Sequence, residues 1–133
     1  MYLLDSCTVS DFMKGEIATA KKIKSLSPSL MYTSTITQLE IKYGLLRKFN
    51  SSHKYFKIFE DFMTVITVLP FEEEAANCSA KIMVELNRKG IPIGAYDILI
   101  GGIALASGLT LVTSNKKEFE RISHLNIENW RVE

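Results

Sequence analysis

One stretch of the chain determines its fold class: DILIGGIALASGLTLVTSN, residues 97–115. Its first part, residues 97–107, is almost wholly apolar, and a helix that is apolar all round is buried. Gly101 and Gly102 within this helix permit close contact with a neighbouring backbone. Residues 109–112 then form a short apolar run between turn and polar residues, which predicts a strand. The stretch therefore indicates a buried helix that leads directly into a strand.

The same alternation of strand and helix patterns extends through the rest of the chain. Short apolar runs predict further strands at residues 2–4, 30–33, 65–69 and 127–130. Helical spacing of apolar residues predicts helices at about residues 6–14, 17–26, 35–48, 54–63, 72–89 and 116–122. Strands that alternate with helices predict a doubly wound α/β sandwich, in which a parallel sheet of four or five strands has helices on both faces.

Apolar spacing also predicts which helix faces are buried, and polar residues predict where helices start. In helix 35–48 the expected buried stripe is Ile36, Leu39, Tyr43 and Leu46. In helix 72–89 the expected buried positions are Ala75, Ala76, Ala80, Met83 and Leu86. Ser34 is the expected cap of helix 35–48, and Ser6 or Thr8 is the expected cap of helix 6–14.

Composition is that of a single folded domain. The 133 residues include 47% apolar and 23% charged residues, which is enough apolar surface for one core and gives no sign of disorder. We therefore expect residues 1–133 to form one domain. The N-terminus has no export signal and no apolar run is long enough to span a membrane, so we expect a cytoplasmic protein. Cys7 and Cys78 are expected to be free thiols.

The charge balance restricts how the chain can bind nucleic acid. A net charge of +1 excludes a protein that coats nucleic acid by charge alone, so any such site must be local. Lysines and arginines gather at residues 21–24, 42–48, 88–89 and 116–121. For each cluster taken alone, a solvated helix face is the simpler interpretation.

Three acidic residues lie where charge is costly. Asp5 follows the first strand, Glu40 borders the apolar stripe of its helix, and Asp97 opens the buried helix. With the strand order 3-2-1-4-5, the ends of the first and fourth strands meet at the switch point where such sheets bind ligands. Carboxylates that converge there repel one another unless a cation compensates. Mg²⁺ or Mn²⁺ suits oxygen ligands and can activate water beside a phosphodiester, so the pattern favours a metal centre.

Each acid has a simpler interpretation when it is considered alone. Asp5 and Asp97 are both placed to cap helices, and an isolated helix-start aspartate is more often a cap than a ligand. Glu40 alone is more often a solvated helix residue. The joint occurrence favours the metal centre, because three independent explanations would otherwise have to hold at positions that are predicted to converge.

Four motifs share the pattern of one known family. They are Leu3-Leu4-Asp5, Thr35-x4-Glu40-Ile41-x2-Gly44-Leu45, Ile93-Gly94-Ala95-Tyr96-Asp97-x2-Ile100-x2-Ile103-Ala104, and Leu111-Val112-Thr113-Ser114-Asn115-x2-Glu118-Phe119. On these motifs the chain resembles a PIN domain and, more narrowly, the VapC-type toxins of bacterial type II toxin–antitoxin modules. The resemblance covers nearly the whole chain. Its most specific parts are the Gly-Ala-Tyr-Asp motif and the last of the four.

The resemblance implies a function. Asp5, Glu40 and Asp97 match the acidic metal ligands of a Mg²⁺-dependent endoribonuclease, in which Mn²⁺ can substitute and hydrolysis leaves a 5′-phosphate and a 3′-hydroxyl. Such toxins typically cut tRNA or a ribosomal RNA loop, form homodimers, and are silenced by a cognate VapB-type antitoxin. The segment 115–119 resembles the subgroup that cleaves the anticodon loop of initiator tRNA.

The chain departs from the family pattern in its last acidic motif. Many relatives carry a fourth aspartate where this chain has Asn115, which is a neutral oxygen ligand that we still place in the catalytic centre. Glu118, or else Glu120, is a candidate for the missing charge, although an acid at a helix N-terminus is also favoured by the helix dipole. Ser6 and Thr113 are candidates for supporting hydroxyl groups.

Two rival functions remain open at this point. The first is another metal-dependent phosphohydrolase with an aspartate after its first strand, but a haloacid dehalogenase-type phosphatase needs a second aspartate where Cys7 stands. The second is a catalytically silent module that binds RNA or an antitoxin, which the loss of an acid at Asn115 would explain. Thiol catalysis by Cys7 is disfavoured, because neither His53 nor His124 has a suitable spacing.

Overall fold

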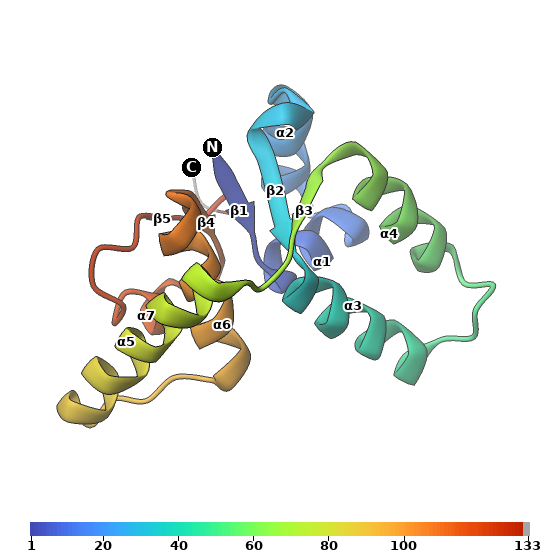
Figure 1. Ribbon diagram of the computed structural model, residues 1–133. Coiled ribbons are helices and arrows are strands. Elements are labelled where there is room, and N and C mark those ends of the chain that lie inside the picture. Colours follow the sequence, from blue (N-terminus) through green and yellow to red (C-terminus); the bar gives the residue numbers. More distant parts are fainter. Residues whose placement is uncertain (132–133) are drawn as a thin grey trace.

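A five-stranded parallel sheet lies at the centre of the computed structural model, which describes residues 1–131 (Figure 1). The strands are β1 (Tyr2–Leu4), β2 (Met31–Ser34), β3 (Thr67–Leu69), β4 (Thr110–Val112) and β5 (Ile127–Glu128). Their order is β3-β2-β1-β4-β5, and all neighbouring strands are parallel. The predicted order 3-2-1-4-5 is confirmed, and it places the ends of β1 and β4 side by side.

Helices cover both faces of this sheet (Figure 1). They are α1 (Ser6–Lys14), α2 (Ile17–Ser25), the 3-10 turn Pro28–Leu30, α3 (Thr35–Lys48), α4 (Lys54–Val65), α5 (Glu73–Lys89), α6 (Ala95–Ser107) and α7 (Lys116–Phe119). Side chains alternate across each strand, so Leu4 and Val112 enter a core with α1 to α4, whereas Leu3 and Leu111 enter a core with α5 to α7. Within residues 1–131 no helix is long and apolar enough to cross a membrane.

Two predicted boundaries are wrong in ways that matter for the core and the site. β3 begins at Thr67 and not at Val65, because Val65 completes α4 and Ile66 is buried in the core beside that helix. The buried helix α6 begins at Ala95, so Asp97 lies inside its first turn and does not cap it. A residue inside the first turn is free to direct its side chain toward the end of the sheet.

The predicted buried stripe of α3 is wrong at three of its four positions, whereas Ile36 is partly buried against the core. The positions that face the core are Thr37, Ile41 and Leu45. Leu39, Tyr43 and Leu46 instead have exposed fractions of 50%, 62% and 69%. Ser34 caps the helix as predicted, and its position at the buried end of β2 fixes the rotation of α3 so that most of the apolar stripe faces solvent.

The contact between α5 and α6 confirms the close backbone contact predicted for Gly102, whereas Gly101 faces isoleucine side chains. A Cβ atom at Gly102 would lie 2.7 Å from the carbonyl oxygen of Ala75 and would also clash with the side chain of Ser79. The predicted buried face of α5 is partly wrong, because Ala76, Ala80 and Met83 are exposed while Ser79 and Ile82 are buried. The small Ser79 lies where the two helices cross closely, and its hydroxyl donates to the carbonyl of Ile98 on α6.

Candidate active site

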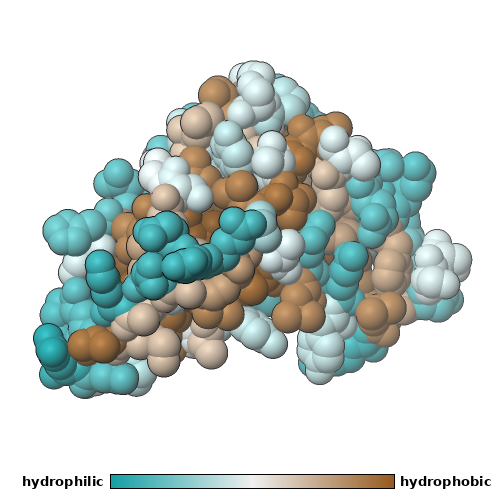
Figure 2. Space-filling view, viewed as in Figure 1, coloured by the Kyte–Doolittle hydropathy of each residue, from teal (hydrophilic) through white to brown (hydrophobic). Residues whose placement is uncertain are grey.

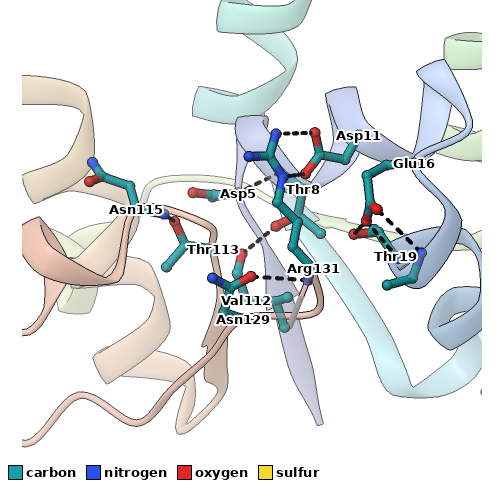
Figure 3. Close-up of polar contacts among 11 residues, drawn as sticks. Asp5, Thr8, Asp11, Glu16, Thr19, Val112, Thr113, Asn115, Asn129 and Arg131 are labelled. Carbon is teal, nitrogen blue, oxygen red and sulfur yellow. Dashed lines mark hydrogen bonds and ion pairs between the residues drawn. The ribbon is translucent and has the colours of Figure 1, made fainter. Parts of the chain in front are cut away.

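Asp5 lies at the carboxyl end of β1 and is almost fully buried, with an exposed fraction of 3%. It caps α1 by accepting a 2.9 Å hydrogen bond from the backbone N–H of Thr8, so the prediction that Ser6 or Thr8 caps this helix is wrong (Figure 3). Burial raises the pKa of Asp5 from its ordinary 3.8 to about 6, although hydrogen bonds from Thr113 and Thr8 oppose this rise. A buried carboxyl with a raised pKa is typical of a functional site.

Glu40 reaches the same centre from α3. Its carboxylate accepts a 2.7 Å hydrogen bond from the hydroxyl of Ser6 at the start of α1. The charge of Glu40 adds to the effect of burial in raising the pKa of both Asp5 and Asp97. The predicted contribution of Ser6 therefore takes the form of a hydrogen bond that holds Glu40 beside Asp5.

Asp97 and Glu118 form the second half of the centre. Burial and the nearby charge of Glu118 raise the pKa of Asp97 from 3.8 to about 7, and Glu40 and Asp5 add to the rise. Glu118 accepts a 2.6 Å hydrogen bond from the backbone N–H of Gly94, which lowers the pKa of Glu118. Glu118 is therefore a stabilised carboxylate, whereas its neighbour Asp97 resists ionisation. Such an asymmetry is what two like charges in close proximity produce.

Asn115 and Thr113 connect these two halves. The side-chain amide of Asn115 donates a 2.9 Å hydrogen bond to Glu118 and so orients this carboxylate. The backbone N–H of Asn115 donates to the hydroxyl of Thr113 (Figure 3). Thr113 is fully buried, and its side-chain hydrogen bond lowers the pKa of Asp5. Through Thr113 and Asn115, the segment that follows β4 thus contacts both Asp5 and Glu118.

Taken together, the carboxylates of Asp5, Glu40, Asp97 and Glu118 come from four different elements and influence one another. As they stand, no group of three acidic, histidine or cysteine side chains within residues 1–131 is close enough to hold a metal ion. The donor set nevertheless suits a hard divalent cation, because its ligands are carboxylate oxygens. A cation would also offset the repulsion that contributes to the raised pKa values of Asp5 and Asp97.

Cys7 lies beside this centre but is not suited to catalysis. Cys7 is exposed, but partial desolvation, followed by the charge of Asp5, raises the pKa of its thiol from 9.0 to about 11. Since the thiolate is the nucleophilic form, a thiol that stays protonated near neutral pH is inert. Cys7 and Cys78 are both free, as predicted.

One family model covers nearly the whole of this fold. Residues 2–125 match the family model described as the PIN domain. The chain belongs to the PIN domain family. The resemblance inferred from the four sequence motifs is therefore confirmed.

Relatives of this PIN domain include toxins and toxin–antitoxin complexes. The tRNA(fMet)-specific endonuclease VapC of Salmonella typhimurium is 36% identical over 97% of both chains. The crystal structure of DNA-bound VapBC from Salmonella typhimurium superposes with a TM-score of 0.88, at 36% identity over 97% of both chains. VapBC2 from Rickettsia felis, bound to a DNA fragment from its promoter, also gives a TM-score of 0.88, at 28% identity over 97% of this chain and 98% of the other.

The sequence of this PIN domain indicated which acids form the site but not which of them interact most strongly. It identified Asp5, Glu40 and Asp97 as the centre and placed Glu118 among the supporting residues, whereas in the structure Glu118 is the carboxylate that most affects Asp97. The signal for this was the three-residue spacing between Asn115 and Glu118, which brings both to one face of a helical turn. The backbone N–H of Gly94, which holds Glu118, has no signature in side-chain chemistry.

Proposed function

We propose that this PIN domain is the toxin of a type II toxin–antitoxin module and acts as a Mg²⁺-dependent endoribonuclease. The observation that carries the proposal is the convergence of four carboxylates at the carboxyl edge of the sheet, two of them with raised pKa values. Relatives that are 33% to 36% identical over 97% of the chain are named ribonuclease VapC or tRNA(fMet)-specific endonuclease VapC. Acidic centres of this kind suit phosphodiester hydrolysis, because a hard cation there activates water and orients the phosphate.

Each residue of the site has an assigned role in this proposal. Asp5, Glu40 and Asp97 hold Mg²⁺, for which Mn²⁺ can substitute, and Asn115 contributes to the catalytic centre. Ser6 holds Glu40 by its hydrogen bond, and Thr113 supports Asp5. Glu118 supplies the fourth negative charge of the centre in place of the neutral Asn115, and it stays ionised because Gly94 and Asn115 donate to it.

The proposed substrate is tRNA, and initiator tRNA cut in its anticodon loop is the specific expectation. The names of two relatives support this choice, because both are described as tRNA(fMet)-specific endonucleases. Loss of initiator tRNA would inhibit translation, which is how such an activity would be toxic. Cleavage of a defined single-stranded loop also fits an open edge that can admit an unpaired strand.

The proposed partners are a VapB-type antitoxin and a second copy of the chain in a homodimer, within a cytoplasmic complex. Solved relatives are described as VapBC complexes, which supports the antitoxin. The exposed apolar side chains of α3, which are Leu39, Tyr43 and Leu46, support a further protein contact. We also propose that residues 1–133 form a single domain, of which 132–133 lie outside the described residues.

The test is cleavage of total bacterial RNA by the purified, antitoxin-free protein with Mg²⁺, with Mn²⁺ and with EDTA. We expect a discrete product that needs the cation, is lost in Asp5→Asn, and persists in the control Asp61→Asn, which changes an exposed aspartate on α4. Tight RNA or antitoxin binding without any cleavage would instead favour a catalytically silent module, which the neutral Asn115 would explain. Turnover of a generic phosphomonoester without RNA cleavage would favour another phosphohydrolase.

A further inference from the structure

A groove of about 540 Å³ leads away from the acidic centre between α1 and α3. Ser6 and Glu40 line it at the acidic end, and Lys14, Arg47 and Lys48 line it at the other end. The surface is also indented along its lower edge, between the half that carries α5 and α6 and the half that carries α3 and α4 (Figure 2). The acidic centre is therefore continuous with an open, elongated surface.

The direction of the two helices explains why this groove is acidic at one end and basic at the other. Both α1 and α3 begin at the carboxyl edge of the sheet, where Asp5 and Ser34 cap them, and both end in basic residues. Lys14 follows Ser6 by eight residues and Lys48 follows Glu40 by eight residues, so each basic end lies about 12 Å from the acidic end. Two separate helices thus deliver positive charge to the same end of one groove.

These positive charges are not neutralised by neighbouring acids. Lys14, Arg47 and Lys48 are all exposed, and none of them makes a salt bridge within residues 1–131. A basic residue in the last turn complements the helix dipole, but that effect does not require both helices to direct their charges to one groove. Between the two ends, a Cβ atom at Gly44 would meet nothing within 4 Å, so the groove has room for a ligand there.

We propose that this groove binds the single-stranded RNA segment next to the cleaved phosphodiester, with Lys14, Arg47 and Lys48 contacting its phosphates. The proposal rests on the ribonuclease function proposed above. Proteins bind single strands by a positively charged groove that follows the sugar–phosphate backbone. Since the net charge of the chain is only +1, such local charge is needed to hold RNA beside four carboxylates. The small side chain of Ser10 and the open surface at Gly44 leave space for ribose and base.

The test compares two triple variants that remove equal charge. The groove variant is Lys14→Gln/Arg47→Gln/Lys48→Gln, and the control is Lys24→Gln/Lys81→Gln/Arg88→Gln, which changes exposed residues of α2 and α5. Both are made in an Asp5→Asn background, so that binding is measured without cleavage. The probe is fluorescein-labelled bulk bacterial tRNA, titrated with antitoxin-free protein over a series of salt concentrations.

We expect the groove variant to lose at least tenfold in affinity at low salt and the control to retain wild-type affinity. Three lost phosphate contacts should also reduce the slope of log K against log salt by about 2, at about 0.7 per contact for a single strand. With the acidic centre intact, the same substitutions should raise KM and leave kcat nearly unchanged, because the contacts bind ground state and transition state alike. Matched thermal melting of both triple variants establishes that they fold.

The outcomes separate this proposal from the function on which it rests. Equal loss of affinity in both triple variants, or unchanged affinity and slope in the groove variant, would overturn it. If the groove variant keeps its affinity for tRNA but loses affinity for an antitoxin, the groove is an antitoxin site and the proposal is also overturned. If wild-type protein cleaves no RNA yet binds it through these three residues, the ribonuclease assignment fails while the groove assignment stands.

Discussion

Replacement of Asp5 by asparagine should stabilise the fold in a way that depends on pH. Burial raises the pKa of Asp5 from 3.8 to about 6, so the folded protein holds this proton more tightly than the unfolded chain does. Stability is therefore lost as pH rises from about 4 through 6, where the folded state must carry a buried charge. At about 1.4 kcal/mol per pKa unit, the loss is about 3 kcal/mol.

Asparagine keeps the cap of α1, because its side-chain oxygen can accept the hydrogen bond from Thr8 that Asp5 accepts now. The amide that it introduces adds a contribution that does not vary with pH. The difference in unfolding free energy between Asp5→Asn and wild type should thus grow by about 2 kcal/mol between pH 4 and pH 8, because the unfolded chain is already partly ionised at pH 4. Urea denaturation at each pH, in EDTA, measures this difference, and Asp61→Asn, which changes an exposed aspartate on α4, serves as the control.

Divalent cation provides the second arm of the same experiment. If Asp5 is a ligand, Mg²⁺ binds the folded wild type and raises its unfolding free energy by mass action, so the advantage of Asp5→Asn shrinks. A difference that does not change with pH would refute the reasoning from burial. Equal stabilisation of both proteins by Mg²⁺ would refute the role of Asp5 as a metal ligand.

Three further predictions follow from the packing and from the acidic pair. Glu118→Gln should lower the pKa of Asp97 from about 7, since it removes the largest charge effect on that group, and an NMR titration that still gives about 7 would contradict this. Gly102→Ala should destabilise the fold by about 1 to 3 kcal/mol in urea denaturation, because its Cβ meets backbone of α5. Gly101→Ala should cost less, because its Cβ meets the end of a flexible isoleucine side chain, and an equal cost would contradict the argument. Leu111→Ala should cost about 2 to 5 kcal/mol by the same assay, because the side chain is fully buried in the centre of the sheet.

The local sequence pattern was sufficient to predict the architecture and most of the acidic residues of the site. The order of short apolar runs and helical spacings predicted the parallel sheet and helices on both faces, whereas the order of the strands was predicted as that of a PIN-like fold. These features follow from chain connectivity and from side-chain periodicity, both of which can be read from sequence. Asp5, Glu40 and Asp97 could be selected because each is a charge that borders apolar sequence.

The local sequence pattern failed where the rotation or attachment of a helix decides which of its residues are buried. The apolar stripe of α3 was predicted to be buried, but the attachment of this helix to β2 at Ser34 leaves Leu39, Tyr43 and Leu46 exposed. Periodicity indicates that a helix has an apolar face but not whether that face meets the core or another protein. The same limit applies to α5, where the close crossing with α6 buries Ser79 and leaves Met83 exposed.

The sequence by itself therefore determined the α/β class and indicated an acidic centre. Only the tertiary structure decided that Glu118 is the principal partner of Asp97, that Asn115 and Gly94 hold Glu118, and that a basic-ended groove adjoins the site. The physical reason is that periodicity and charge are properties of the chain, whereas burial, desolvation and hydrogen bonds between distant residues arise only when separate elements meet. A backbone N–H such as that of Gly94 is present at nearly every position, and only the fold selects the one that binds a carboxylate.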